Sequence, residues 1–174
     1  KRRTRLSLVF PRHYLWSGYL QLGMGWAIPD DGVAERTGFA LDTEVGMRLL
    51  VGTWGRTLLT LWPVVGYSFD TVTEPKPHGH LFTVGAGIMV HFHNYLFSLG
   101  PMSRFVVGVA DDRRAYGVRN GLRFEVLLGL IGAEVSHQLL WVGGGQRHDV
   151  RFVLGIDVLQ WRRYLKVLSF LTGL

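Results

Sequence analysis

Alternation between apolar and small or polar side chains is the sequence feature that most constrains this fold. Between Phe39 and Val51 every second residue is apolar except for one threonine, whereas the intervening positions include Asp42, Glu44 and Arg48. Successive side chains of a β-strand point to opposite faces of a sheet, so a period of two predicts a strand with one apolar face. A helix would instead repeat its apolar positions every three to four residues.

Similar segments recur along the chain and are separated by residues that favour turns. We predict eight strands, which cover residues 14–26, 39–51, 56–69, 80–92, 95–109, 118–131, 133–141 and 149–159. The orientation of the seventh segment is ambiguous from its pattern. Pairing of residues 5–10, or of the C-terminal tail, would raise the strand number to ten.

The predicted connections alternate between long and short. The long ones are residues 27–38, 70–79, 110–117 and 142–148, and the short ones lie near 52–56, 92–95 and 131–133. This asymmetry is typical of transmembrane β-barrels, which have long outer loops and short periplasmic turns. An even number of strands would place both ends of the chain on the periplasmic side.

The composition favours a membrane barrel over a soluble one. The chain is 48% hydrophobic and 18% charged, yet no run approaches the roughly 18 apolar residues of a transmembrane helix. In a soluble barrel such as a lipocalin, the less apolar face of each strand would meet water. That face is here rich in Gly, Ser and Thr, which is poor solubilising material. We therefore predict an all-β, antiparallel transmembrane β-barrel of about eight strands, followed by a short C-terminal amphipathic helix.

With this alternation, loop asymmetry and the aromatic ends of its strands, the segment 14–159 resembles the small outer-membrane barrels as a class, such as the membrane domain of OmpA and the OmpX-like proteins. The resemblance is architectural and includes no diagnostic motif of a specific family. It implies a porin-like fold in the outer membrane of a Gram-negative bacterium. Such chains usually end at the last strand, commonly on an aromatic residue, whereas this sequence continues past Leu159 to Leu174.

The two ends of the sequence concentrate the basic charge of a chain whose formal net charge is +6. We predict a basic periplasmic arm at residues 1–13, the barrel at 14–159, and an amphipathic tail at 160–174 that lies on the membrane surface or on a partner. The expected contacts with lipid headgroups or a partner are Lys1, Arg2, Arg3, Arg5, Trp161, Arg162, Arg163, Tyr164 and Lys166. No basic stripe lies between the ends, so nucleic acid is not an expected partner.

The face opposite the apolar one carries nearly balanced charge. We expect a salt-bridge network in the barrel lumen made of Asp42, Glu44, Arg48, Arg104, Arg123, Glu125, Glu134, Arg151 and Asp157. Charges in a narrow interior must pair, because an isolated buried charge is very costly. A selective pore would show an excess of one sign, so near balance predicts a closed interior.

Neither a metal site nor a catalytic site emerges from the motifs. The sequence has no cysteine. The pairs His78/His80 and His91/His93 could each supply two metal ligands, but no third ligand lies at a fixed spacing. Ser136 and His137 are adjacent, so on a strand they point to opposite faces and do not form a dyad. We therefore expect no cofactor, no metal and no catalytic residue.

These observations predict a non-catalytic integral outer-membrane β-barrel that acts as a membrane anchor or as a subunit of a larger cell-envelope assembly. Its expected partners are outer-membrane lipid and lipopolysaccharide, with one or more proteins on the periplasmic side. Two alternatives stay open. One is an outer-membrane enzyme that modifies lipid A by acyl hydrolysis or transfer, and the other is a narrow pore.

Overall fold

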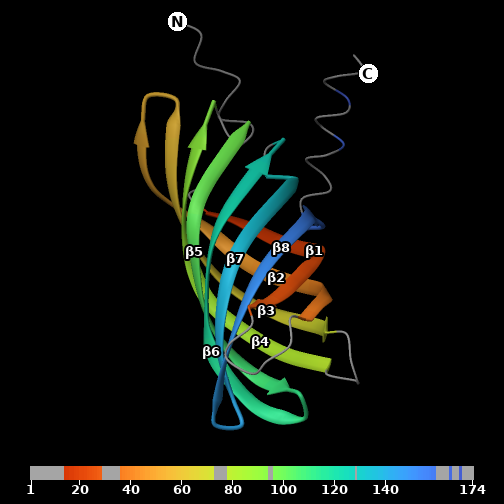
Figure 1. The fold of residues 1–174 in the computed structure, drawn as a ribbon. Helices are drawn as coiled ribbons and strands as arrows, with labels where there is room; N and C mark the ends of the chain where they lie inside the picture. The colour runs from red at the N-terminus through yellow and green to blue at the C-terminus, as the bar shows by residue number, and fades with distance from the viewer. Residues whose placement is uncertain are drawn as a thin grey trace, which may run out of the picture.

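The chain forms a closed barrel of eight antiparallel strands (Figure 1). The computed structural model describes residues 14–28, 36–72, 78–93, 96–127 and 129–159, together with Leu165 and Ser169. The strands are β1 (Tyr14–Ile28), β2 (Arg36–Trp54), β3 (Thr57–Val72), β4 (His78–Phe92), β5 (Phe97–Ala110), β6 (Arg113–Val126), β7 (Ile131–Val142) and β8 (Gly145–Asp157). Each strand pairs with the next, and β8 pairs with β1 to close the ring. The predicted all-β fold of about eight antiparallel strands in a closed barrel is thereby confirmed.

The predicted arm and the predicted tail lie outside the described residues, apart from Leu165 and Ser169 in the tail. The helix expected there is consequently not part of the described fold. Among the described residues, no helix has the length and hydropathy needed to cross a membrane.

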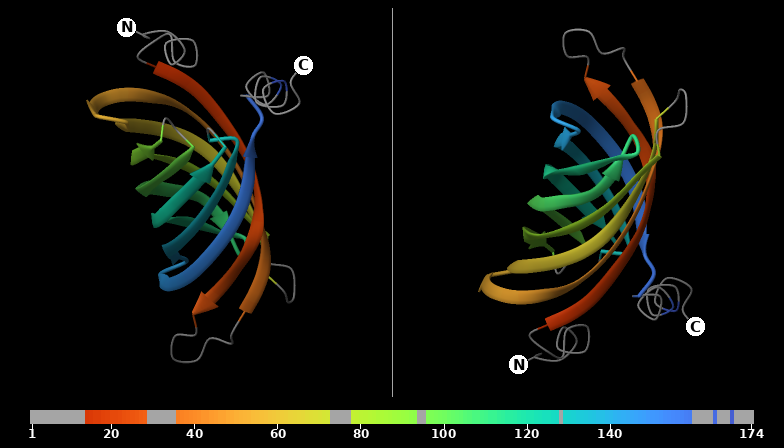
Figure 2. Two further views of the ribbon diagram at one scale, coloured as in Figure 1. Left: turned by 90° about the horizontal axis from the view of Figure 1, so that it is seen from above. Right: turned by 90° about the horizontal axis from the view of Figure 1, so that it is seen from below.

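Because the number of strands is even, the barrel begins and finishes at the same end. Tyr19 of β1 pairs with Asp157 of β8, so the start of the first strand and the finish of the last lie together. We call this the terminal end, and it also carries the turns after β2, β4 and β6. The opposite end, the distal end, carries the turns after β5 and β7. Figure 2, which views the barrel along the vertical axis of Figure 1, shows how strongly the strands are inclined.

Two of the predicted long connections, 110–117 and 142–148, are wrong. In each case the strands continue through most of the expected loop and are joined by a two-residue turn. Two-residue hairpin turns of the kind that matches strand twist need positive φ angles, which Asp and Gly tolerate. The turn residues with positive φ are Asp111 (52°), Asp112 (58°), Gly143 (58°) and Gly144 (93°). The polar residues beside them belong to hairpins that extend past the apolar part of the strands.

The polarity of the barrel is inverted relative to a soluble protein. Large apolar side chains point outward and stay exposed, as shown by Phe82 (62%), Val65 (58%) and Ile156 (55%). Charged side chains point inward and are buried, and Arg123 and Glu125 are both 0% exposed. The face orientation predicted for β2, β4, β5 and β8 is confirmed. The ambiguous seventh strand places Val135 outside and Glu134 inside.

The interior also holds apolar side chains that the alternation did not predict. One cluster consists of Tyr19, Trp62, Val64, Met89 and Met102. A second cluster, of Leu81, Val106, Ala110, Ala115 and Leu140, lies where β4 to β7 line the barrel wall. These side chains fill the space between the charged groups, so the interior is a packed core.

Candidate functional site: the charged barrel interior

A cluster of two arginines and two glutamates crosses the centre of the barrel. Arg104 of β5 contacts Glu44 of β2 at 2.6 Å and Glu134 of β7 at 2.6 Å. Arg123 of β6 contacts the second oxygen of Glu44 at 2.8 Å and Glu134 at 3.6 Å. Glu44 therefore bridges two guanidinium groups, and four strands are joined through the lumen. All four side chains are at most 3% exposed.

Arg48 and Glu125 extend this cluster toward the terminal end. Both guanidinium N–H groups of Arg48 donate to Glu125 at 2.7 Å, which is the bidentate geometry of a strong ion pair. Glu125 also accepts from Nε of Arg123 at 3.0 Å. One carboxylate thus contacts two buried cations that come from strands on different sides of the barrel.

Aromatic rings cover the same arginines. The guanidinium of Arg123 lies 4.0 Å from the Tyr19 ring centroid and 4.5 Å from that of Trp62. Arg48 lies 4.7 Å from the Trp62 ring. The Tyr19 hydroxyl donates to the backbone carbonyl of Gly129, in the turn that joins β6 to β7. This turn carries the 4%-exposed Leu130 and bonds into the lumen, so it helps to close the terminal end.

A second charged cluster lies toward the distal end. Asp42 receives hydrogen bonds from Arg119 at 3.2 Å and from Arg151 at 2.9 Å. Arg151 also contacts Asp70 at 2.9 Å. Ser68 accepts from both arginines, at 3.1 Å and 2.9 Å. Each cation of this cluster is therefore held by at least one carboxylate and one neutral acceptor.

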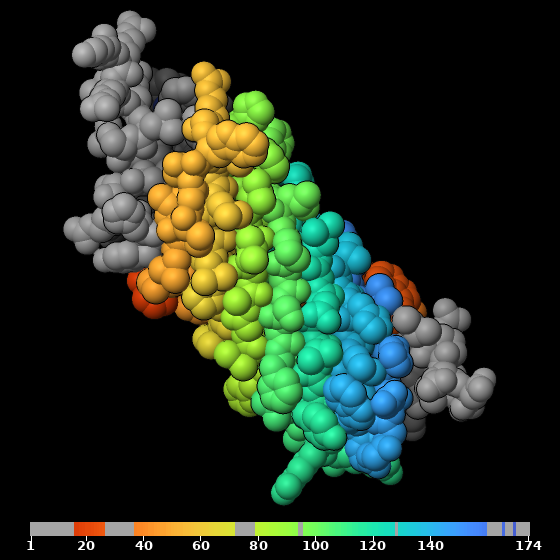
Figure 3. Space-filling model, turned by 90° about the vertical axis from the view of Figure 1, so that its left-hand side faces the viewer, coloured from red at the N-terminus to blue at the C-terminus, as the bar shows by residue number. Residues whose placement is uncertain are grey.

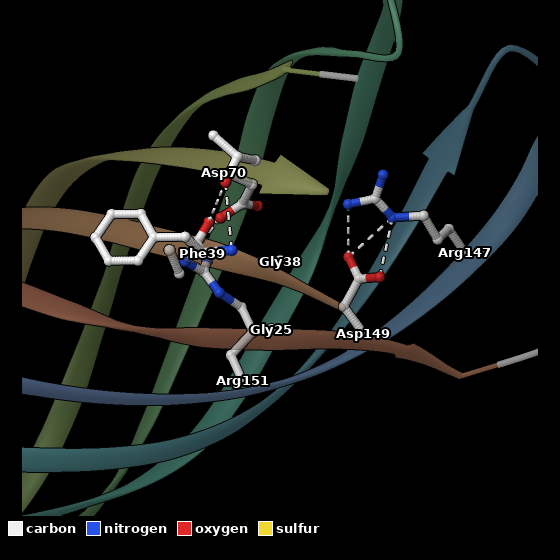
Figure 4. Close-up of a pocket in the computed structure, with 9 residues that line it drawn as sticks. Gly25, Gly38, Phe39, Asp70, Arg147, Asp149 and Arg151 are labelled. Carbon is white, nitrogen blue, oxygen red and sulfur yellow. Dashed lines mark hydrogen bonds and ion pairs between the residues drawn. The ribbon is translucent and has the colours of Figure 1, made fainter. Parts of the chain in front are cut away.

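Arg147 and its carboxylates lie at the distal mouth of the lumen. Arg147 donates to Asp149 at 2.8 Å and to Asp111 at 3.4 Å. Figure 4 shows this pair beside Asp70 and Arg151 around a small cavity. The cavity measures about 20 Å³, which is room for a single water molecule.

A buried histidine links three strands near the terminal end. His91, which is 0% exposed, has Nε2 at 2.7 Å from the hydroxyl of Thr60 and Nδ1 at 2.6 Å from the hydroxyl of Ser98. The two hydroxyls occupy both ring nitrogens. The ring is a structural bridge between β3, β4 and β5.

The structure brings the predicted lumen residues together. All nine are buried, and eight of them take part in the ion pairs described above. The ninth, Asp157, accepts hydrogen bonds from the backbone N–H groups of Gly18 and Leu159. The nine contacts predicted in the arm and the tail, from Lys1 to Lys166, lie outside the described residues.

Sequence reasoning missed several members of the network, namely Arg119, Asp70, Asp149 and Arg147 with their partners Ser68 and Gln138. Arg119 shares the inward phase of Arg123, so the alternation of β6 could have identified it. Asp70 fell at a predicted loop boundary, and Arg147 fell inside a predicted loop that is in fact part of β8.

Of the pairs considered in the sequence, His91 and His93 differ in burial, as do Ser136 and His137. His80 points outward beside Tyr67, whose hydroxyl it meets through Nδ1, whereas His91 is enclosed in the lumen. Ser136 is 4% exposed inside the barrel, and His137 is on the outer face. Within the described part of the chain, no group of three or more potential metal ligands comes together.

Fold and interior together define a class: a small eight-stranded antiparallel β-barrel with an apolar outer wall and a closed, ion-paired lumen. No known family matches the sequence, and no curated protein matches it. Among solved structures, the chain is similar to Neisserial surface protein A (NspA). The TM-score is 0.44 at 10% identity, and the match covers 84% of this chain and 99% of that one.

Proposed function

We propose that this protein is a non-catalytic integral β-barrel of a Gram-negative outer membrane, and that it serves as a rigid anchor or subunit of an envelope assembly. The observation that carries the proposal is the inverted polarity of the wall. Outward side chains such as Leu22, Val84, Leu122 and Leu154 are each at least half exposed. Exposed apolar area on that scale is unfavourable in water and favourable in lipid.

The closed lumen supports an anchor rather than a pore. The central ion pairs of Arg104 and Arg123 cross the barrel, and the aromatic rings of Tyr19 and Trp62 cover them. Opening a path would break buried ion pairs, each of which costs about 3–5 kcal/mol when one partner is lost. A continuous water path through this interior is therefore not expected.

The outward serine of β5 is not arranged as the nucleophile of a lipid-modifying enzyme. Such an enzyme would need a nucleophilic hydroxyl and a histidine within hydrogen-bonding distance on the lipid-facing side. The outward hydroxyl of Ser103 donates to the side-chain carbonyl of Asn120 at 2.7 Å. Mass spectrometry of lipid A from cells with and without the protein should give identical spectra, and a new or missing acyl chain would contradict a non-catalytic role.

Folding into lipid tests the membrane assignment. Urea-unfolded protein diluted into phospholipid vesicles should become resistant to protease over its barrel, and it should migrate differently on a denaturing gel before and after boiling. The same dilution into buffer without lipid should give aggregates, because the large apolar wall would be exposed to water. A soluble monomer in lipid-free buffer would refute the proposal.

The assembly role is the finer part of the proposal, and it rests on the basic, amphipathic chemistry of the ends of the sequence. Gentle detergent extraction of the native membrane should recover a stoichiometric protein partner. Deletion of residues 160–174 should release that partner while the barrel still folds. Recovery of the barrel without any partner, from both forms, would remove the subunit role and leave the anchor.

A further inference from the structure

A row of polar side chains interrupts the apolar outer wall across β5 to β8. Ser103 pairs in register with Asn120, and Asn120 pairs with His137, so the three lie side by side on neighbouring strands. Ser103 donates to the Asn120 side-chain carbonyl at 2.7 Å. His137 Nε2 lies 3.2 Å from Nδ1 of His148, which extends the row onto β8. Figure 3 shows the continuous outer wall to which these strands belong.

The row lies in the middle of the apolar surface and not at its rim. Along β5 the outward residues on either side of Ser103 are Pro101 and Phe105, and apolar residues continue to both ends of the strand. Along β6 the outward neighbours of Asn120 are Val118 and Leu122. A chain that sits in a bilayer as proposed above would therefore present this row to the hydrocarbon core.

Hydrocarbon cannot accept a hydrogen bond from the side-chain amide of Asn120. Within the described residues, the Asn120 side chain accepts from Ser103 and donates to no acceptor. An amide left without an acceptor in lipid is costly, and polar side chains on membrane-embedded surfaces usually face another protein surface. The side-chain amide of Asn120 therefore needs a hydrogen-bond acceptor from outside the barrel.

Another outward polar group on this wall serves as a comparison. Tyr67 and His80, on β3 and β4, satisfy each other through the hydroxyl and Nδ1. Thr43 on β2 donates to the backbone carbonyl of Tyr67 at 3.4 Å. This part of the wall borders a groove lined by Val45, Val65 and Phe82, which suits an acyl chain. Its polar groups are paired within the barrel, unlike the amide of Asn120.

We propose that the polar row is the contact surface for a second copy of this chain, with Asn120 at the centre of a symmetric dimer in the membrane. An amide both donates and accepts, so Asn120 can pair with Asn120 of the second copy. Because Ser103 and His137 each lie one strand from Asn120, a two-fold axis along the membrane normal puts Ser103 of one copy on the same side as His137 of the other.

Branched aliphatic side chains flank the row on three of its strands. The outward neighbours of the row include Val118, Val135 and Val150 together with the bulkier Phe105 beside Ser103, whereas Tyr116 and Trp141 lie further along the strands. In membranes, polar side chains hydrogen-bond across the contact between two packed surfaces. The dimer rests on the membrane assignment proposed above. It adds a second copy of this chain as a partner of the proposed membrane anchor.

Cross-linking in vesicles tests the dimer, because the chain has no cysteine of its own. A Val118→Cys variant, which leaves the row intact, should form a covalent dimer with a short bismaleimide. The matched Val65→Cys variant, on β3 three strands away from β6, should stay monomeric. Adding Asn120→Leu to Val118→Cys should weaken the dimer about 10- to 100-fold, from two hydrogen bonds worth about 3- to 10-fold each.

The outcomes separate the dimer from the membrane assignment. Cross-linking at Val118 that persists on dilution with lipid and falls with Asn120→Leu supports the dimer. Protein that inserts into vesicles but shows equal, dilution-sensitive cross-linking at Val118 and Val65 overturns the dimer and leaves the anchor intact. Thr43→Leu is the control for a polar-to-apolar change on the outer wall, and dimer loss equal to that of Asn120→Leu also overturns the proposal. Protein that does not insert overturns both.

Discussion

Glu125 is the lumen carboxylate whose neutralisation should be most destabilising. It accepts both N–H groups of Arg48 at 2.7 Å and Nε of Arg123 at 3.0 Å, and it is 0% exposed. Glu125→Gln keeps the shape of the side chain but removes the negative charge that contacts two buried cations. Removing one partner of a buried ion pair costs about 3–5 kcal/mol. We expect the free energy of unfolding to fall by about that amount.

Glu44→Gln provides the graded comparison. Glu44 bridges Arg104 and Arg123, but Arg104 keeps two bonds to Glu134, at 2.6 and 2.7 Å. Since both arginines retain another carboxylate, the loss should be smaller, about 1–3 kcal/mol on the scale of a charged hydrogen bond. Both values can be measured by urea titration of the barrel in phospholipid vesicles, followed by tryptophan fluorescence.

A double-mutant cycle checks the physical reason. Replacing both Arg48 and Glu125 by Met removes the buried cation together with its anion, so the double variant should be more stable than Glu125→Met alone. The reasoning would be refuted if the double variant lost the sum of the two single effects. It would also be refuted if Glu125→Gln unfolded at the same urea concentration as the unchanged protein.

Four further substitutions test other parts of the structure, each by the same urea titration. Val65→Arg places a charge on the outward wall and should lower the free energy of unfolding by about 2–4 kcal/mol near the bilayer midplane. Trp54→Arg, at the 88%-exposed hairpin tip, should change that free energy little. Equal effects of the two substitutions would contradict the placement of the wall in lipid. Tyr19→Phe removes the hydroxyl that donates to the Gly129 carbonyl and should cost about 1 kcal/mol; an unchanged unfolding midpoint would count against that contact. Gly144→Ala should cost about 1–2 kcal/mol because the turn holds residue 144 at φ 93°, and a neutral result would contradict the two-residue turn between β7 and β8.

Much of the architecture could be predicted from the sequence because strand geometry fixes which face each residue occupies. Once Phe39 is outward, Asp42 and Glu44 must be inward, and the same logic placed Arg104 and Arg151 in the lumen. Turn chemistry was harder to predict. Asp111 and Asp112 were predicted to lie in a long loop. They form instead a two-residue turn with positive φ angles, and the strands continue on both sides of it.

The pairing within the interior could not be predicted, because it depends on contacts across the barrel. Arg48 and Glu125 are 77 residues apart in sequence, and only the closed ring brings them to 2.7 Å. The stacking of Arg123 on Tyr19 and Trp62 likewise needs the register of three strands. The outer polar row is a register feature too, since Ser103 and Asn120 are neighbours only because β5 and β6 pair as they do.

Conductance across a planar lipid bilayer tests the central claim, which is a membrane-spanning barrel with a closed interior. The protein is first shown to be inserted by its protease resistance in vesicles, and the vesicles are then fused with the bilayer. The ion pairs of Arg104, Arg123 and Arg48 and the ring of Trp62 over them predict no steady current at moderate voltage in either polarity. A stable, ohmic current that rises in equal steps with each insertion would contradict this account.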